Sequence, residues 1–244
     1  MHKEVGRVVN IAVVIAGGSG RRMGQEMPKQ FIHVDGKPVI IYTLEGLQRH
    51  PQIDAIEVVC IDGWQDTLQA YVKKHGIDKL RGITPGGETA QESIRNGLEA
   101  LDGQCDDEDV VVVHDGIRPL VDADVLSDVI VTCQRHGNGV TSLPYNEQIF
   151  VADDDVSTVR YIPRDTLRRV STPQAYKYGR LRDRYREAFA TGVGVSPSSY
   201  ANTMMVELGE RLYFAAGSER NIKLTTAEDL ELFRAFLAMT KPEG

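Results

Sequence analysis

NIAVVIAGGSGRRMGQEMPKQ, residues 10–30, is the stretch that decides how the rest of the chain is interpreted. Its apolar run 11–15 is short and rich in β-branched residues, which is typical of a strand buried on both faces. The glycines that follow let backbone N–H groups approach a ligand closely, and the basic residues beyond them supply the charge that binds a polyphosphate. The spacing matches neither a P-loop nor the dinucleotide-binding fingerprint. A tight turn that carries solvated charges is the alternative interpretation.

Length, charge and cysteine usage limit the class of protein. With 244 residues, 41% of them hydrophobic, the chain can bury one large core, and we predict a single domain over residues 1–244. A net charge of −7 argues against nucleic acid or a membrane as partner, so an anionic ligand requires local basic clusters. The three cysteines lack metal-ligand spacing, and the sequence has no signal-peptide pattern and no long apolar run. These features predict a cytoplasmic protein with reduced thiols.

Strand and helix patterns alternate along the first half of the chain. Buried strands are predicted at 56–61 and 110–113, a weaker one around Ile83, and helices at 39–50, 64–75 and 91–101. This order predicts an α/β, Rossmann-like fold with a mostly parallel, twisted sheet flanked by helices.

The second half of the chain has a different pattern. After a strand at 140–144, two short runs at 148–151 and 158–162 flank an acidic turn, which predicts a protruding β-arm at about 140–165. A helix at 178–190, a Gly/Ser/Pro-rich stretch at 191–202 and a strand at 212–215 follow. The last helix is predicted to start at Thr226, with Asp229 in its first turn.

Two polar clusters follow predicted strands, at the edge where open α/β sheets bind ligands. GGETAQES, residues 86–93, can cradle a base or a ribose, although an ordinary loop with a helix N-cap is the alternative. HDGIRP, residues 114–119, places Asp115 where it can hold Mg²⁺ or a hydroxyl, and Arg118 where it can bind phosphate. A structural Asp115–Arg118 salt bridge is the alternative for this cluster.

The complete string at 18–30 resembles the G-x-G-x-R-M-x(n)-P-K-Q signature of nucleotidyltransferases that activate sugar or polyol phosphates. Its Pro-Lys-Gln narrows the resemblance to the cytidylyltransferases that act on methylerythritol phosphate and ribitol phosphate. Further motifs of this family are matched in the same order, between about residues 11 and 237, at 86–93, 114–119, 164–174 and 217–230.

The resemblance implies roles for individual residues. CTP would contact two loops, whose residues are Ala16, Gly17, Gly18, Gly20, Gly86, Gly87, Glu88 and Ser93. Arg22 and Lys29 would stabilise charge at the α- and β-phosphates, whereas Lys223 and Arg164 would hold the acceptor phosphate. The acceptor site would also include Asp115, Arg118 and Gln148, and Asp115 would bind Mg²⁺.

The sequence also departs from the family pattern near the acceptor and the metal. Ala90 stands in place of an Arg, Gln148 in place of a Thr, and Phe150 in place of a Lys. The stretch 199–202 lacks the family's Thr-Asp pair. These differences bear on which acceptor the protein uses.

The implied reaction is transfer of CMP from CTP to a polyol phosphate with release of pyrophosphate. Methylerythritol 4-phosphate, in isoprenoid precursor synthesis, is the expected acceptor, and ribitol 5-phosphate, which would give CDP-ribitol, is the alternative. A homologue that binds nucleotide without turnover is a third possibility, against which the four retained cations argue. The resemblance further implies a homodimer in which the arm of one subunit completes the other's site, although an arm of this composition could also be surface decoration.

Overall fold

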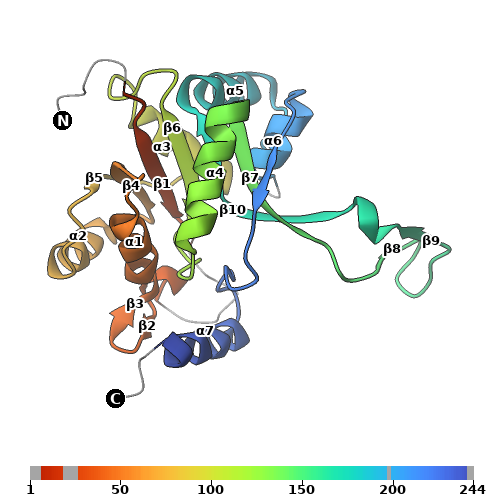
Figure 1. Ribbon diagram of the computed structural model, residues 1–244, viewed down its shortest axis with the longest axis horizontal. Coiled ribbons are helices and arrows are strands. Elements are labelled where there is room, and N and C mark those ends of the chain that lie inside the picture. The colour runs from red at the N-terminus through yellow and green to blue at the C-terminus, as the bar shows by residue number, and fades with distance from the viewer. Residues whose placement is uncertain (1–6, 19–26, 197–198, 241–244) are drawn as a thin grey trace.

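A twisted sheet of seven strands forms the centre of the protein (Figure 1). The computed structural model describes residues 7–18, 27–196 and 199–240. The strand order is β11-β7-β10-β6-β1-β4-β5. Their bounds are β1 Asn10–Ala16, β4 Ala55–Cys60, β5 Leu80–Pro85, β6 Val110–Asp115, β7 Asn138–Pro144, β10 Arg168–Lys177 and β11 Phe214–Ala216. Only β10 runs antiparallel to its neighbours, β6 and β7, so the sheet is mostly parallel, as predicted.

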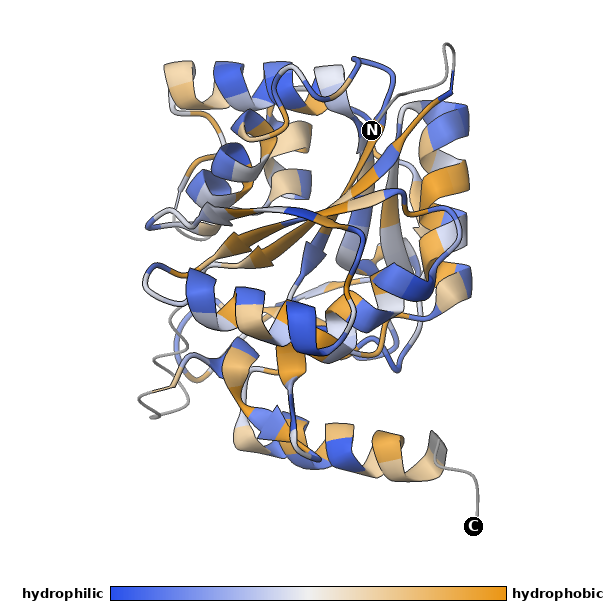
Figure 2. Cartoon of the chain, turned by 90° about the vertical axis from the view of Figure 1, so that its left-hand side faces the viewer, coloured by the Kyte–Doolittle hydropathy of each residue, from blue (hydrophilic) through white to orange (hydrophobic). Residues whose placement is uncertain are grey.

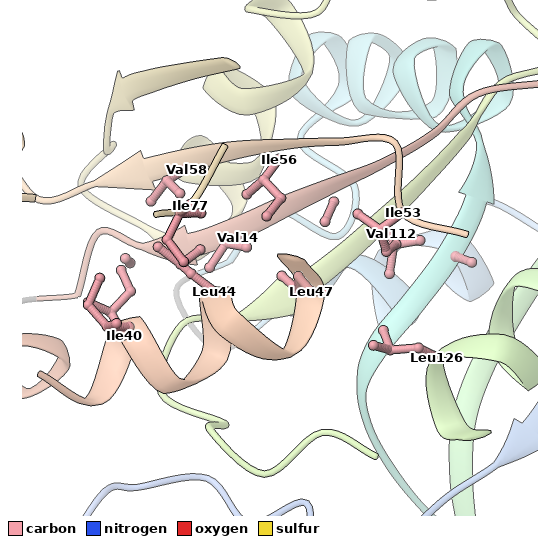
Figure 3. Close-up of a cluster of buried hydrophobic side chains, with 14 of the residues drawn as sticks. Val14, Ile40, Leu44, Leu47, Ile53, Ile56, Val58, Ile77, Val112 and Leu126 are labelled. Atoms are coloured by element: carbon pink, nitrogen blue, oxygen red, sulfur yellow. The ribbon is translucent and has the colours of Figure 1, made fainter. Parts of the chain in front are cut away.

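Helices cover both faces of the sheet, which explains the continuous apolar runs of the strands. In β1, Ala12 and Val14 face one layer, and Ile11 and Val13 face the other. The first layer consists of α1 Val39–Arg49, α2 Gln65–Lys74 and α4 Ala123–His136; the second consists of α3 Ala90–Glu99, α5 Tyr178–Thr191 and α6 Ala201–Glu207. The helices carry hydrophilic residues alongside apolar ones, whereas the central strands are mainly hydrophobic (Figure 2). Side chains of α1 pack directly on β1 and β4 (Figure 3).

A third, smaller core lies at the end of the molecule where the chain closes. The helix α7 Ala227–Thr240 packs near the two-stranded ribbon of β2 His33–Val34 and β3 Lys37–Pro38 (Figure 1). Phe233 of α7 is buried there and meets Tyr42 edge-on. Thr226 Oγ1 accepts a bond from Asp229 N–H, and the Asp229 carboxylate accepts from Thr226 N–H, so the predicted cap of this helix is confirmed.

The predicted β-arm extends away from the body of the protein (Figure 1). It contains the hairpin of β8 Ile149–Val151 and β9 Arg160–Ile162, followed by the short 3-10 helix η3 Arg164–Thr166. Asp153 and Asp154 accept backbone and side-chain hydrogen bonds within the tip, which explains the acidic turn. Large apolar side chains of the arm, among them Phe150 and Tyr161, are exposed.

Several elements differ from the sequence-based expectation. The strand at 80–85 is complete rather than weak, and the strand expected at 212–215 is β11 at Phe214–Ala216. The helices α4 and α6 and the strand β10 were not predicted. The first half of β10 is exposed and lacks an apolar pattern, because it pairs there with β7 alone, on the way from the arm, and meets β6 only from Gln174 on. No helix among the described residues is long and apolar enough to cross a bilayer.

Candidate active site

A pocket of about 360 Å³ lies at the carboxyl ends of β1 and β6. Its walls are the loop after β1, the start of α3, and the segment that precedes α7. The predicted site residues that line it are Ala16, Gly17, Gly18, Lys29, Gly87, Glu88, Ser93, Asp115 and Lys223. A larger cavity, of about 570 Å³, lies at the amino ends of the strands, beside Glu57 and Arg81, and contains none of the predicted residues.

The two glycine loops touch each other at Gly17 and Gly86. A Cβ on Gly86 would lie 3.1 Å from the Cα of Gly17 and 3.3 Å from the carbonyl oxygen of Cys60. A Cβ on Gly18, by contrast, would meet none of the described residues within 4 Å. Gly86 is therefore required for the packing of the loops, whereas the backbone of Gly18 is accessible from the pocket.

Gln30 holds the first loop in place. It belongs to the short 3-10 helix η2 Lys29–Phe31 and is only 1% exposed. Its Nε2 donates to the carbonyl oxygens of Ala16, at 2.7 Å, and Gly18, at 3.2 Å. Gln30 thereby fixes the loop on both sides of Gly17 and brings Lys29 to the pocket wall.

The second loop is ordered by a capping box at the start of α3. Thr89 Oγ1 accepts from Glu92 N–H at 3.1 Å, and the Glu92 carboxylate accepts from Thr89 N–H at 3.0 Å. Ser93 Oγ accepts from Gly87 N–H and donates to Thr89 O. The N-cap and the ligand-binding interpretations of this motif are thus compatible, because the cap is what holds Gly87 at the pocket.

Asp115 is the charged centre of the site. Its Oδ2 is 3.0 Å from Arg118 Nε and 3.2 Å from Lys223 Nζ, and its N–H donates to Thr172 Oγ1 at 3.0 Å. Burial favours a raised pKa for this carboxyl, but Lys223 and Arg118 outweigh burial and lower the pKa to about 2. Asp115 is therefore ionised at neutral pH.

His114 is a buried support of this centre. Burial, more than the opposing effect of Asp115, lowers the pKa of His114 to about 4, so the ring is neutral. Its Nε2 lies 3.2 Å from the carbonyl oxygen of Arg118, which can only accept, so Nε2 carries the proton. His114 is therefore a core histidine.

Comparisons with known proteins identify the family. The model of the 2-C-methyl-D-erythritol 4-phosphate cytidylyltransferase (IspD) family matches residues 10–239. The chain belongs to this family. A ribitol-5-phosphate cytidylyltransferase of Lacticaseibacillus paracasei is 58% identical, over 93% of this chain and 97% of that protein. A 2-C-methyl-D-erythritol 4-phosphate cytidylyltransferase of Geobacter metallireducens is 35% identical, over 95% and 98% of the two chains.

The fold agrees with this assignment. The structure of a 4-diphosphocytidyl-2C-methyl-D-erythritol synthase from Anaerococcus prevotii superposes with a TM-score of 0.80 and 25% identity, over 95% of this chain and 99% of that one. As a member of the IspD family, the protein is a cytidylyltransferase, and hence a nucleotidyltransferase.

Not all predicted residues gather at the pocket of this cytidylyltransferase. Gly86 borders an adjoining hollow with Gly17 and Glu88. Arg118 does not line the pocket. It forms the structural salt bridge with Asp115 that was the alternative interpretation of this motif, and its Nη1 donates to Asn221 O at 2.7 Å. Gln148 and Arg164 lie on the arm, apart from Lys223 within one chain. Gly20 and Arg22 lie outside the described residues.

Several residues of the candidate site were not identified as site residues from the sequence. Thr172 and Asn221 contact the Asp115 centre, and Tyr200 lines the pocket with its ring centroid 5.8 Å from Lys223 Nζ. Tyr200 belongs to the stretch that lacks the family's Thr-Asp pair. The matched motifs contained Thr172 and Asn221, but only the fold shows that they meet at Asp115.

Proposed function

We propose that the protein transfers CMP from CTP to ribitol 5-phosphate and releases pyrophosphate, forming CDP-ribitol. The observation that carries this choice is the 58% identity, over nearly full length, to a ribitol-5-phosphate cytidylyltransferase. The first expectation, methylerythritol 4-phosphate in isoprenoid precursor synthesis, is supported by the name of the matching family and a relative at 35% identity, and it becomes the second candidate. The departures at Gln148 and Phe150 agree with a change of acceptor.

In the proposed reaction, an oxygen of the acceptor phosphate attacks the α-phosphorus of CTP. A new P–O bond forms, the α–β phosphoanhydride bond breaks, and pyrophosphate carries away the negative charge. The protein's task is to align the two phosphates and to stabilise the charge that develops between them. Lys29 beside the first loop would face the triphosphate, together with Arg22, and Lys223 would face the acceptor phosphate.

Mg²⁺ is the metal that we propose for this site. Asp115 is ionised and lies at the pocket, as a hard-cation ligand must, but one of its oxygens already meets two cations. No group of three potential ligands occurs among the described residues. In this proposal Asp115 would hold Mg²⁺ together with phosphate oxygens, and the metal would neutralise phosphate charge.

We further propose that the working form is a homodimer in the cytoplasm. Arg164 and Gln148 lie on an arm that extends away from the body of the protein (Figure 1), and they border a different hollow from the one that Lys223 lines, so an acceptor site that includes them needs the arm of a second subunit. Phe150 and Tyr161 are 58% and 68% exposed, and a two-stranded ribbon with such side chains gains stability by packing on another surface.

Pyrophosphate release tests the proposed function. The enzyme would be assayed with CTP and either ribitol 5-phosphate or methylerythritol 4-phosphate, and then with ATP, GTP or UTP in place of CTP. We expect the highest kcat/KM with CTP and ribitol 5-phosphate. A higher value with methylerythritol 4-phosphate would reverse the two candidates. CTP binding without turnover of either acceptor would indicate a binding homologue.

A further inference from the structure

The segment that carries Lys223 has no regular secondary structure. Between the end of β11 and the start of α7, residues 217–226 form neither helix nor strand. The position of Lys223 is therefore not fixed by the main-chain hydrogen bonds of a sheet or a helix. Its position depends on individual hydrogen bonds to neighbouring segments.

Asn221 makes two of these bonds. It is 4% exposed, and its Nδ2 donates to the carbonyl oxygen of Thr172 at 2.7 Å. Its main-chain carbonyl oxygen accepts from Arg118 Nη1 at 2.7 Å. A further main-chain bond, from Leu224 N–H to Ile117 O at 2.9 Å, holds the other side of Lys223.

The bonds of Asn221 close a ring around the acidic centre. Thr172, which receives the amide of Asn221, also accepts the Asp115 N–H through its hydroxyl. Arg118, which donates to Asn221, also donates to Asp115 Oδ2, the atom that Lys223 approaches. Three distant parts of the chain thus meet at Asp115, and Asn221 is bonded to two of them.

We propose that Asn221 is a positioning residue that holds Lys223 and Arg118 in register with Asp115. It touches no substrate itself; it acts through Lys223, and the inference therefore rests on the proposed role of Lys223 in the transfer. The side chain is suited to this task because a buried amide bonded to a main-chain carbonyl has few alternative positions. A displacement of about 1 Å at a reacting group can lower the rate by about 100-fold.

Two variants of Asn221 and a matched control test the inference. Asn221→Ala removes the donor, and Asn221→Asp keeps the shape but turns a carboxylate oxygen toward Thr172 O. The control is Asn138→Ala, since Asn138 is also a buried asparagine whose side chain bonds to main-chain groups: its Nδ2 donates to Arg211 O at 2.8 Å and its Oδ1 accepts from Tyr213 N–H at 3.0 Å. All three variants should lower the Tm by at least about 2–4 °C, because each loses one buried side-chain hydrogen bond or, in Asn138→Ala, two.

Only the Asn221 variants should lose activity. We expect both to lower kcat/KM for ribitol 5-phosphate by about 10- to 100-fold, while Asn138→Ala stays within about twofold of wild type. The Kd for CTP, measured by calorimetry, should stay within about threefold of wild type. Equal activity of the Asn221 variants and Asn138→Ala at equal Tm would overturn the inference, because Asn221 would then be structural only.

A double-mutant cycle with Lys223→Ala shows whether Asn221 acts through Lys223. In the Lys223→Ala background, Asn221→Ala should lower kcat/KM by less than about threefold further, since the group that it positions is gone. Independent, multiplying losses would contradict the inference. If the wild-type enzyme used methylerythritol 4-phosphate instead, the acceptor proposal would fail, and the same cycle would test Asn221 with that acceptor.

Discussion

Lys223 Nζ lies 3.2 Å from Asp115 Oδ2, so the last motif of the sequence meets the end of the central strand β6. The same carboxylate oxygen receives Arg118 Nε. One carboxylate thus holds two cations, and of these two Lys223, with 31% of its side chain exposed, is the one that lines the pocket. This relationship makes Lys223 available to a phosphate without leaving it unpaired before the substrate binds.

Replacing Lys223 should affect catalysis much more than folding. Lys223→Ala removes a cation that would stabilise the developing phosphate charge, and we expect kcat/KM for the polyol phosphate to fall by about 10²–10³. Pyrophosphate release at saturating CTP measures this loss. Lys177→Ala is the control, because Lys177 Nζ donates to Glu108 O at 2.8 Å outside the site. A loss of similar size in Lys177→Ala would show that the effect is not specific to the site.

Two glycine substitutions should separate packing from ligand approach. Gly86→Ala places a methyl group 3.1 Å from Gly17 Cα, and we expect it to lower the free energy of unfolding by about 1–3 kcal/mol. In Gly18→Ala the methyl group meets none of the described residues, so the Tm should stay unchanged, but CTP binding should weaken if the backbone there approaches the phosphates. Thermal unfolding and calorimetric titration with CTP measure the two effects. Unchanged CTP affinity in Gly18→Ala would remove Gly18 from the binding loop.

Gln30 Nε2 holds the loop after β1, so replacing this nitrogen by an oxygen should weaken the loop's attachment. Gln30→Glu would turn a buried carboxylate oxygen toward the carbonyl oxygens of Ala16 and Gly18, and we expect a loss of about 1–3 kcal/mol in stability together with weaker CTP binding. Denaturant unfolding and CTP titration at pH 8 measure both. The control is Gln104→Glu, since Gln104 makes a comparable bond to Ala100 O on the surface. If Gln30→Glu behaved like this control, the bonds from Gln30 to the loop would not be required for stability or CTP binding.

Mixing two inactive variants should reveal the shared site. If the arm completes the partner's pocket, a hybrid of Lys29→Ala and Arg164→Ala subunits contains one pocket with both cations intact. Random exchange of subunits should then restore about a quarter of the wild-type activity. The measurement is pyrophosphate release before and after exchange, with exchange followed by native mass spectrometry. No recovery after proven exchange would place Arg164 in the site of its own subunit.

Glu57 should make the stability of the protein depend on pH. Burial raises the pKa of this carboxyl, and the Thr84 hydroxyl at 2.6 Å offsets the shift only partly. Because the folded-state pKa lies above the unfolded-state pKa, the stability that Glu57 contributes is present at low pH and is lost as the pH rises through the folded-state pKa. Glu57→Gln should therefore raise the Tm at pH 7 and leave it nearly unchanged near pH 4.

A control keeps the pH test specific. Glu45→Gln removes the partner of Lys37 Nζ, at 2.7 Å, and should lower the Tm at pH 7 instead of raising it. A Glu57→Gln variant that is less stable than wild type at pH 7 would show that its carboxylate is held by a favourable contact.

Local patterns in the sequence were sufficient for much of the fold. The β-branched run of β1, the periodicity of α1 and the cap of α7 each depend on neighbouring residues, and each is confirmed. The family, too, could be recognised from short motifs. These features are readable because the interactions that produce them join residues close together in the chain.

Only the tertiary structure decided how the motifs combine. The strand β10 enters the sheet antiparallel between β6 and β7, and this brings Thr172 to Asp115. The same assembly pairs Lys223 with Asp115 and leaves Arg164 on an arm, apart from Lys223 in its own chain. The sequence by itself determined which residues carry the charge, whereas the fold determined which of them meet. The reason is physical: long-range pairings depend on the packing of whole layers, and no local pattern records them.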